Sequence, residues 1–127
     1  MQKLLLFVAL TGCVLQAQDF ANPKPKPGLN FWRASITALG AANAMDVQSS
    51  WGKHELNSTL SNNSGTFGAQ GALIKLGLQG SLVGIEYLIT RRHPSARLYR
   101  ALGFINFGAA AGIAGVAAHN YGVPSAR

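Results

Sequence analysis

The chain is poor in charged residues, poorer still in acidic ones, and contains a single cysteine. Charged residues make up 12% of the sequence, against roughly 25% in an average soluble domain. One cysteine excludes a disulfide framework and a cysteine-rich zinc module. Intrinsic disorder is also disfavoured, because 48% of the residues are hydrophobic. With 127 residues, the chain can form one domain at most.

The motifs of common enzyme and metal sites are also missing. The sequence has no HExxH, CxxC, DxDxDG or GxSxG pattern and no phosphate-binding P-loop. His54 and Glu55 are adjacent, so they would not face one metal ion from one side of a helix, where neighbours are three or four residues apart. We therefore expect no catalytic residue, no enzyme activity, no bound metal and no cofactor.

Residues 1–18 have the pattern of an export signal. Lys3 precedes an apolar run from Leu4 to Leu15, and the small Ala17 follows it. Such a run is too short to cross a bilayer, which takes about 20 residues. A basic start, a short apolar stretch and a small residue are typical of a secretory signal, and a short N-terminal anchor is the alternative. Residues 19–30, which contain most of the prolines, predict an extended linker.

Three long apolar segments follow, and they predict an all-α membrane protein. The helical domain is expected over residues 31–122, with helices at about 31–50, 67–91 and 96–120 and a short tail at 123–127. Asn30, Thr66 and Ser95 are plausible N-caps for the three helices. Both a membrane helical hairpin and a three-helix bundle fit this pattern.

The first segment has tryptophans near both ends. Trp32 and Trp51 are 19 residues apart, which is about 28 Å along a helix. That length matches the hydrocarbon core of a bilayer, and Trp favours both interfaces. The spacing indicates a helix that spans the membrane, and an amphipathic helix lying on the surface is the alternative.

Glycines form two stripes at helical spacing. One consists of Gly77, Gly80 and Gly84, and the other of Gly108, Gly112 and Gly115. Small residues four apart let helix backbones approach closely in lipid. We expect the stripes to pack the second helix against the third, with self-association into a homo-oligomer as a further use.

The excess of positive charge lies in two short segments. Residues 24–33 carry Lys24, Lys26 and Arg33, residues 91–100 carry four arginines, and only Lys53 lies between the first two helices. If all three helices span, both basic segments face the cytoplasm. A cleaved signal would instead place the start of the mature chain outside. Either the N-terminal segment is uncleaved and three spans follow, or the first helix does not cross; both alternatives place residues 91–100 in the cytoplasm.

A basic chain also suggests nucleic acid as a partner. Residues 91–100 contain only one aromatic residue, Tyr99, so bases would have no second stacking partner there. Contact with anionic lipid headgroups explains the segment more simply. The expected partner is therefore the lipid bilayer, and no nucleic acid is expected.

Three ionisable residues fall at membrane depth, where such groups are costly and point to function. Asp46 and Lys75 would lie at a similar shallow depth beneath one surface if their helices are antiparallel neighbours, so an ion pair between them is geometrically possible. Glu86 would extend toward Arg91 at the basic interface.

These residues belong to a candidate binding cluster. Its members are Asp46, Glu55, Lys75, Glu86 and His119, with Asn43, His54 and Asn120 beside them. A structural hydrogen-bond network that holds the helices in register is one interpretation. A small binding or ion-relay site is the other.

Two resemblances add to this interpretation. Residues 41–59 contain Asp46, Ser49 or Ser50, Glu55 and Asn57, and this Asp…Ser/Thr…Glu-x-Asn pattern resembles that of small uncharacterised bacterial integral membrane proteins. Leu10 to Cys13, together with the glycine stripes, is similar to glycine-rich helical-hairpin envelope lipoproteins, in which that cysteine is lipidated. The first resemblance implies an integral membrane protein of unknown activity and carries over no catalytic role. Separately, the expected location is the bacterial inner membrane, with export by the N-terminal signal.

The expected function is structural: assembly through glycine-mediated helix packing. The alternatives are a small transport or ligand-binding protein that uses Asp46 and Lys75, and an exported lipoprotein lipidated at Cys13.

Overall fold

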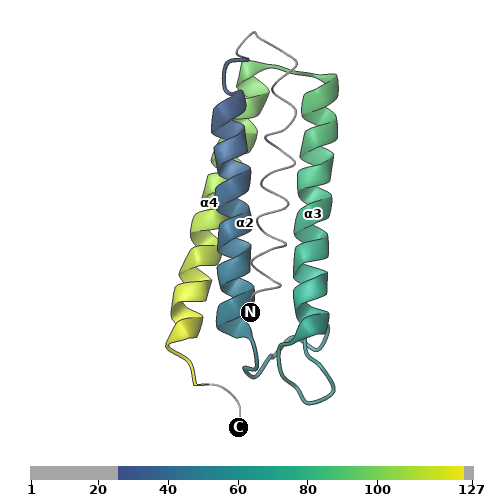
Figure 1. Cartoon of the computed structure of the whole chain (residues 1–127), viewed down its shortest axis with the longest axis vertical. Coiled ribbons are helices and arrows are strands. Elements are labelled where there is room, and N and C mark those ends of the chain that lie inside the picture. The colour runs from purple at the N-terminus through teal and green to yellow at the C-terminus, as the bar shows by residue number, and fades with distance from the viewer. Residues whose placement is uncertain (1–25, 125–127) are drawn as a thin grey trace.

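The computed structural model describes residues 26–124, and these form three α-helices and no strand. The helices are α2 (Leu29–Ser50), α3 (Ala69–Arg92) and α4 (Ala96–Tyr121). They lie side by side, with α2 and α4 running in the same direction and α3 in the opposite one (Figure 1). The predicted all-α class is confirmed, and each helix begins and ends within two residues of its expected range.

Several predictions concern parts of the chain outside the described residues. These are the signal or anchor at residues 1–18, the lipidation of Cys13, the linker before residue 26 and the end of the tail after residue 124.

The helix α2 is the central element of the bundle. Ten of its 22 residues are buried, against three in α3 and five in α4. Near its start Trp32 and Ile36 pack on Tyr99 of α4, and halfway along it Leu39 and Ala42 pack on Ala110. Near its end Val47 packs with apolar residues at the start of α3, namely Phe67 and Ala72. The principal packing is therefore that of α2 on α4, whereas we expected it between the second and third helices.

The glycine stripes do not produce the packing expected of them. No described atom lies within 4 Å of where a Cβ would stand on Gly77, Gly80, Gly84, Gly108, Gly112 or Gly115. The glycine that does allow a close helix contact is Gly103 on α4. A Cβ there would lie 2.5 Å from Cδ1 and Cε1 of Phe31 on α2, whose ring also packs against Phe104 and Phe107. The spacing of the glycines identified two stripes, but no described helix packs against them.

One of the three expected N-caps is confirmed. Ser95 caps α4, because its Oγ accepts a hydrogen bond from the Leu98 N–H at 3.1 Å. The predictions for Asn30 and Thr66 are wrong, since Gly28 and Gly68 occupy the two N-cap positions.

Each of these differences has a local cause. Gly28 has φ 86°, and a Cβ there would lie 3.1 Å from the Cβ of Tyr99, so the chain enters α2 in contact with α4 and needs glycine to do so. Thr66 is held in an extended loop by a bridge to His54 and by its N–H, which donates to Asn62 Oδ1.

Two described helices, α3 and α4, are long and apolar enough to cross a membrane, and α2 is not among them. The role expected of Trp32 is wrong. Its side chain is 3% exposed and packs inside the bundle, whereas Trp51 is 51% exposed. Only Trp51 is therefore placed where a Trp could meet an interface.

Candidate functional site

The described bundle has a partly polar interior and an apolar outer surface on two of its helices. Seven polar or charged side chains are buried: Ser35, Asn43, Asp46, Ser49, Ser50, Thr90 and Asn106. The outer surfaces of α3 and α4 instead expose large apolar side chains: Leu73, Ile74, Leu78, Leu82, Ile85, Leu88, Ile89, Phe104, Ile105 and Val116. A water-soluble domain rarely exposes so many large apolar side chains on two neighbouring helices. The candidates for a functional site are therefore the polar residues buried between the helices.

The first polar centre, which we call the Glu86 network, joins all three helices. Glu86 Oε2 on α3 accepts hydrogen bonds from Trp32 Nε1 on α2 at 2.8 Å and from Asn106 Nδ2 on α4 at 2.9 Å. Asn106 also donates to Ser35 Oγ at 3.3 Å, and that hydroxyl donates to the Trp32 carbonyl at 2.6 Å. A single carboxylate thus fixes the positions of three helices relative to one another.

The Glu86 network was largely missed from the sequence. We expected Glu86 to extend toward Arg91, but its carboxylate turns inward to Trp32 and Asn106. One signal could have found Asn106: it is the only polar side chain between Phe104 and Ala118. A lone amide in a membrane helix faces the protein interior, where it finds partners.

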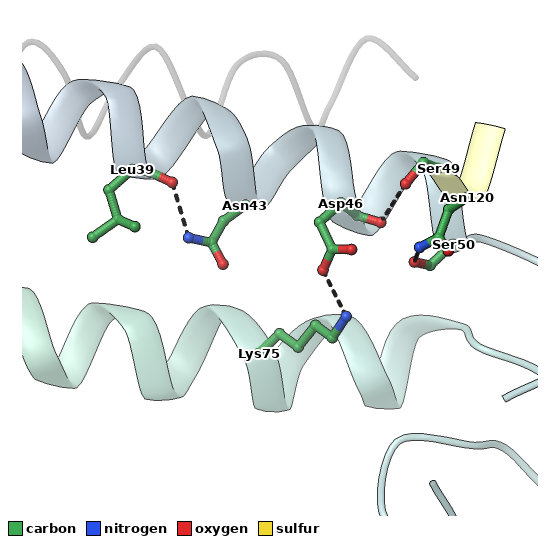
Figure 2. A network of polar contacts seen from close by, with 7 residues as sticks. All are labelled: Leu39, Asn43, Asp46, Ser49, Ser50, Lys75 and Asn120. Carbon is green, nitrogen blue, oxygen red and sulfur yellow. Dashed lines mark hydrogen bonds and ion pairs between the residues drawn. The ribbon is translucent and has the colours of Figure 1, made fainter. Parts of the chain in front are cut away.

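The second polar centre is the ion pair between α2 and α3 (Figure 2). Lys75 Nζ lies 2.6 Å from Asp46 Oδ2, so the ion pair that antiparallel helices would allow is formed. Lys75 also lies 5.0 Å from the centroid of the Phe67 ring, at a distance where a cation is attracted to an aromatic face. The side chain of Asp46 is 7% exposed and that of Lys75 is 27% exposed, so the lysine is the member of the pair that reaches outward.

The ion pair leaves one carboxylate oxygen without a partner. Asp46 Oδ1 is buried and accepts no hydrogen bond from any described residue. The neighbouring polar groups on α2 bond elsewhere: Asn43 Nδ2 donates to the Leu39 carbonyl at 2.9 Å, and Ser49 Oγ donates to the Asp46 carbonyl at 3.0 Å. An unpaired buried acceptor is costly, so this oxygen has the capacity to accept a proton or a small hydrogen-bond donor.

The remaining predicted site residues are not gathered at this pair. Glu55 lies in the loop between α2 and α3, where its Oε1 accepts from the Asn57 N–H at 3.0 Å. Both His54 and His119 are exposed. Glu86 is 11 residues beyond Lys75 on α3, about 16 Å along the axis. The candidate cluster is therefore two separate centres, one of which contains the Asp46–Lys75 pair.

A third group of contacts joins the ends of α2 and α4. Asn120 Nδ2 donates to Ser50 Oγ at 2.9 Å, and the Asn120 carbonyl accepts a hydrogen bond from Lys53 Nζ. Asn120 was expected to reach the same surface as Asp46, and its contacts do lie at that end of the bundle, on Ser50 and Lys53. Within residues 26–124 no group of three or more His, Cys, Asp and Glu side chains is arranged to hold a metal ion.

Comparison with known proteins finds no matching family model, no matching curated protein and no matching solved structure. Function is therefore inferred from the arrangement of the residues themselves.

Breaking the ion pair is expected to destabilise the bundle asymmetrically. Lys75→Met leaves the Asp46 carboxylate buried without a counter-charge and should lower the free energy of unfolding by about 3 kcal/mol. Asp46→Asn should cost less, because the half-buried Lys75 can turn its ammonium group outward. The double variant should recover part of the loss of Lys75→Met. Denaturant unfolding in detergent measures all three, and a Lys75→Met protein as stable as wild type would show that the pair contributes nothing.

The Glu86 network predicts a difference between two substitutions at one position. Glu86→Gln keeps an acceptor oxygen for Trp32 and Asn106 and should change stability little. Glu86→Leu leaves the Trp32 indole N–H unpaired and leaves Asn106 with only its hydrogen bond to Ser35, so it should lower the free energy of unfolding by about 2 kcal/mol. Glu55→Leu, in the loop, is the matched control and should behave as wild type. The same unfolding assay decides: equal losses for Glu86→Gln and Glu86→Leu would contradict the network.

Proposed function

We propose that this chain is an integral membrane protein with a structural role, a helical bundle that assembles with copies of itself in the bilayer. The single observation that supports this most strongly is the apolar outer surface of α3 and α4 around a partly polar interior. Lipid would cover the apolar outer surfaces of α3 and α4, and the buried polar groups would find partners inside the protein, as they must where no water is present.

The exposure of individual apolar residues is high. Leu78 is 64% exposed, Leu82 50% and Phe104 68%. Removing apolar surface from water is worth about 25 cal/mol per Å², so a surface of this kind in water favours aggregation over a stable monomer. In a bilayer the same surface is in its preferred solvent.

The lengths of the helices support a transmembrane arrangement. At 1.5 Å per residue, the 24 residues of α3 and 26 residues of α4 extend about 36 and 39 Å, more than the roughly 30 Å of the hydrocarbon core. The helix α2 lies beside α4 along its length (Figure 1). It would cross at the same depth. Five of its polar residues are buried in the bundle, namely Ser35, Asn43, Asp46, Ser49 and Ser50, which reduces the cost of their insertion.

Three crossings also favour one of the two topologies left open by the sequence. The starts of α2 and α4 and the end of α3 lie at the same end of the bundle. If the arginines there face the cytoplasm, the start of α2 does too, and an uncleaved N-terminal segment is then the consistent choice. Export of Cys13 for lipidation is disfavoured by the same orientation. For a bacterial chain, the membrane would be the inner membrane.

The outward glycines supply a surface for assembly. The stripes on α3 and α4 are open to whatever surrounds the described bundle. Small residues four apart allow close approach of a second helix in lipid, where packing and weak backbone contacts drive association. A second copy of the chain would present the same stripes, so a symmetric contact between copies is the simplest assembly.

A second candidate function is a proton-relay or ligand-binding site at Asp46 and Lys75. This proposal is favoured by Asp46 Oδ1, which is buried and accepts no hydrogen bond from a described residue. Such an oxygen could accept a proton or a hydrogen bond from a ligand. Proton flux in reconstituted vesicles that is the same for Asp46→Asn and wild type would exclude it.

Gly80→Leu and Gly112→Leu should abolish self-association while leaving the fold intact. A Cβ at either position would have no described neighbour within 4 Å, so we expect a stripe blocked by leucine to affect contacts between copies. Gly103→Leu is the control for the opposite effect: it would clash with Phe31 and destabilise the monomer.

The experiment has two readouts. All proteins should first remain in membranes washed with alkaline carbonate; release of the wild type would contradict membrane insertion. Energy transfer between labelled copies in vesicles then measures association, which should fall for Gly80→Leu and Gly112→Leu. Transfer equal to wild type in both variants would exclude assembly through the stripes.

A further inference from the structure

The end of the bundle where α2 and α4 begin and α3 ends is densely cationic. Five exposed cations lie there, which we call the basic rim: Lys26, Arg91, Arg92, Arg97 and Arg100. They come from segments far apart in the sequence that the fold brings together. At Gly28 the start of α2 closely approaches the start of α4. A Cβ on Gly28 would lie 3.2 Å from the Ala96 carbonyl oxygen and 3.5 Å from Cγ of Arg100.

No carboxylate among the described residues neutralises the basic rim. Asp46 and Glu55 belong to the opposite half of the bundle, and Asp46 is paired with Lys75. Glu86 is the acidic residue nearest the rim along α3, but its carboxylate faces inward to Trp32 and Asn106. The positive charge of this end is therefore left for a partner outside the described bundle.

The backbone adds to the same potential. Both α2 and α4 begin at this end, and neither has an acidic residue in its first turn, so the positive ends of two helix dipoles lie among the cations. The negative end of α3 is matched by Arg91 and Arg92 in its last turn. These dipoles strengthen the attraction that the exposed side chains exert on an anion.

The apolar surface begins immediately beside the basic rim. Leu88, 54% exposed, and Ile89, 42% exposed, lie within one turn of Arg91 and Arg92 on α3. In a bilayer this boundary between apolar and cationic side chains falls at the level of the lipid phosphates. Tyr99, the aromatic residue within residues 91–100, is 4% exposed, so its ring is not available for a nucleic-acid base to stack on.

We propose that the basic rim binds the headgroups of anionic lipids in the leaflet that covers this end of the bundle. The inference rests on the proposed membrane insertion and adds a lipid class to it. Arginine suits this partner, since its guanidinium donates two parallel hydrogen bonds to phosphate oxygens.

Spin-labelled lipids in vesicles of the intact chain test the proposal. The motionally restricted fraction gives the association constant of phosphatidylglycerol relative to phosphatidylcholine. Wild type should prefer phosphatidylglycerol. Arg97→Gln with Arg100→Gln should weaken that preference by roughly fivefold for each cation removed. Lys53→Gln, at the opposite end, should leave it unchanged.

Three results would overturn the proposal, and they are distinguishable. Equal association of the two lipids with wild type would exclude headgroup selectivity while leaving membrane insertion intact. Inorganic phosphate that displaces phosphatidylglycerol better than chloride at equal ionic strength would identify a site for free phosphate instead. Absence of any restricted lipid, of either class, would contradict membrane insertion itself.

Discussion

The two hydrogen bonds accepted by Glu86 are the interaction on which the arrangement of the three helices depends. Among the described residues, α3 is joined to its neighbours by few direct contacts, and the Glu86 carboxylate bonds at once to Trp32 on α2 and Asn106 on α4. Removing the Glu86 carboxylate leaves the Trp32 indole N–H without an acceptor and removes one of the two hydrogen bonds of Asn106. The network therefore sets the position of α3, and with it the end of the bundle at which the basic rim forms.

The Asp46–Lys75 pair attaches α3 to α2 near the start of α3, as the Glu86 network does near its end. With Glu86 about 16 Å away along the helix axis, α3 is attached to α2 at two separated levels. Two attachments hold a helix in register better than one, which suits a structural role. The unpartnered oxygen of Asp46 is the one feature that this role does not require, and it is why the same residue supports a second candidate function.

The sequence was sufficient for the helices and for the pair, and insufficient for what the helices contact. Long apolar segments bounded by Pro, Gly and arginine define helices by local rules. Asp46 and Lys75 followed from depth counted along antiparallel helices. The Gly77–Gly80–Gly84 stripe showed which side of α3 is small but not which helix would lie against it. The spacing between Trp32 and Trp51 led to the wrong prediction that Trp32 lies at a membrane interface. Spacing along the sequence could not show that the Trp32 side chain bonds to Glu86 inside the bundle.

Nitroxide labels test the central claim, that the apolar surface of the bundle faces lipid, most directly. Single labels at Leu78, Leu82 and Phe104, in a Cys13→Ser background, report relative accessibility to oxygen, which dissolves in lipid, and to a nickel chelate, which stays in water. In vesicles all three should be more accessible to oxygen, and a label at Leu56, 91% exposed in the loop, should be more accessible to the chelate. Labels at Leu78, Leu82 and Phe104 that the chelate reaches as readily as it reaches Leu56 would contradict the account.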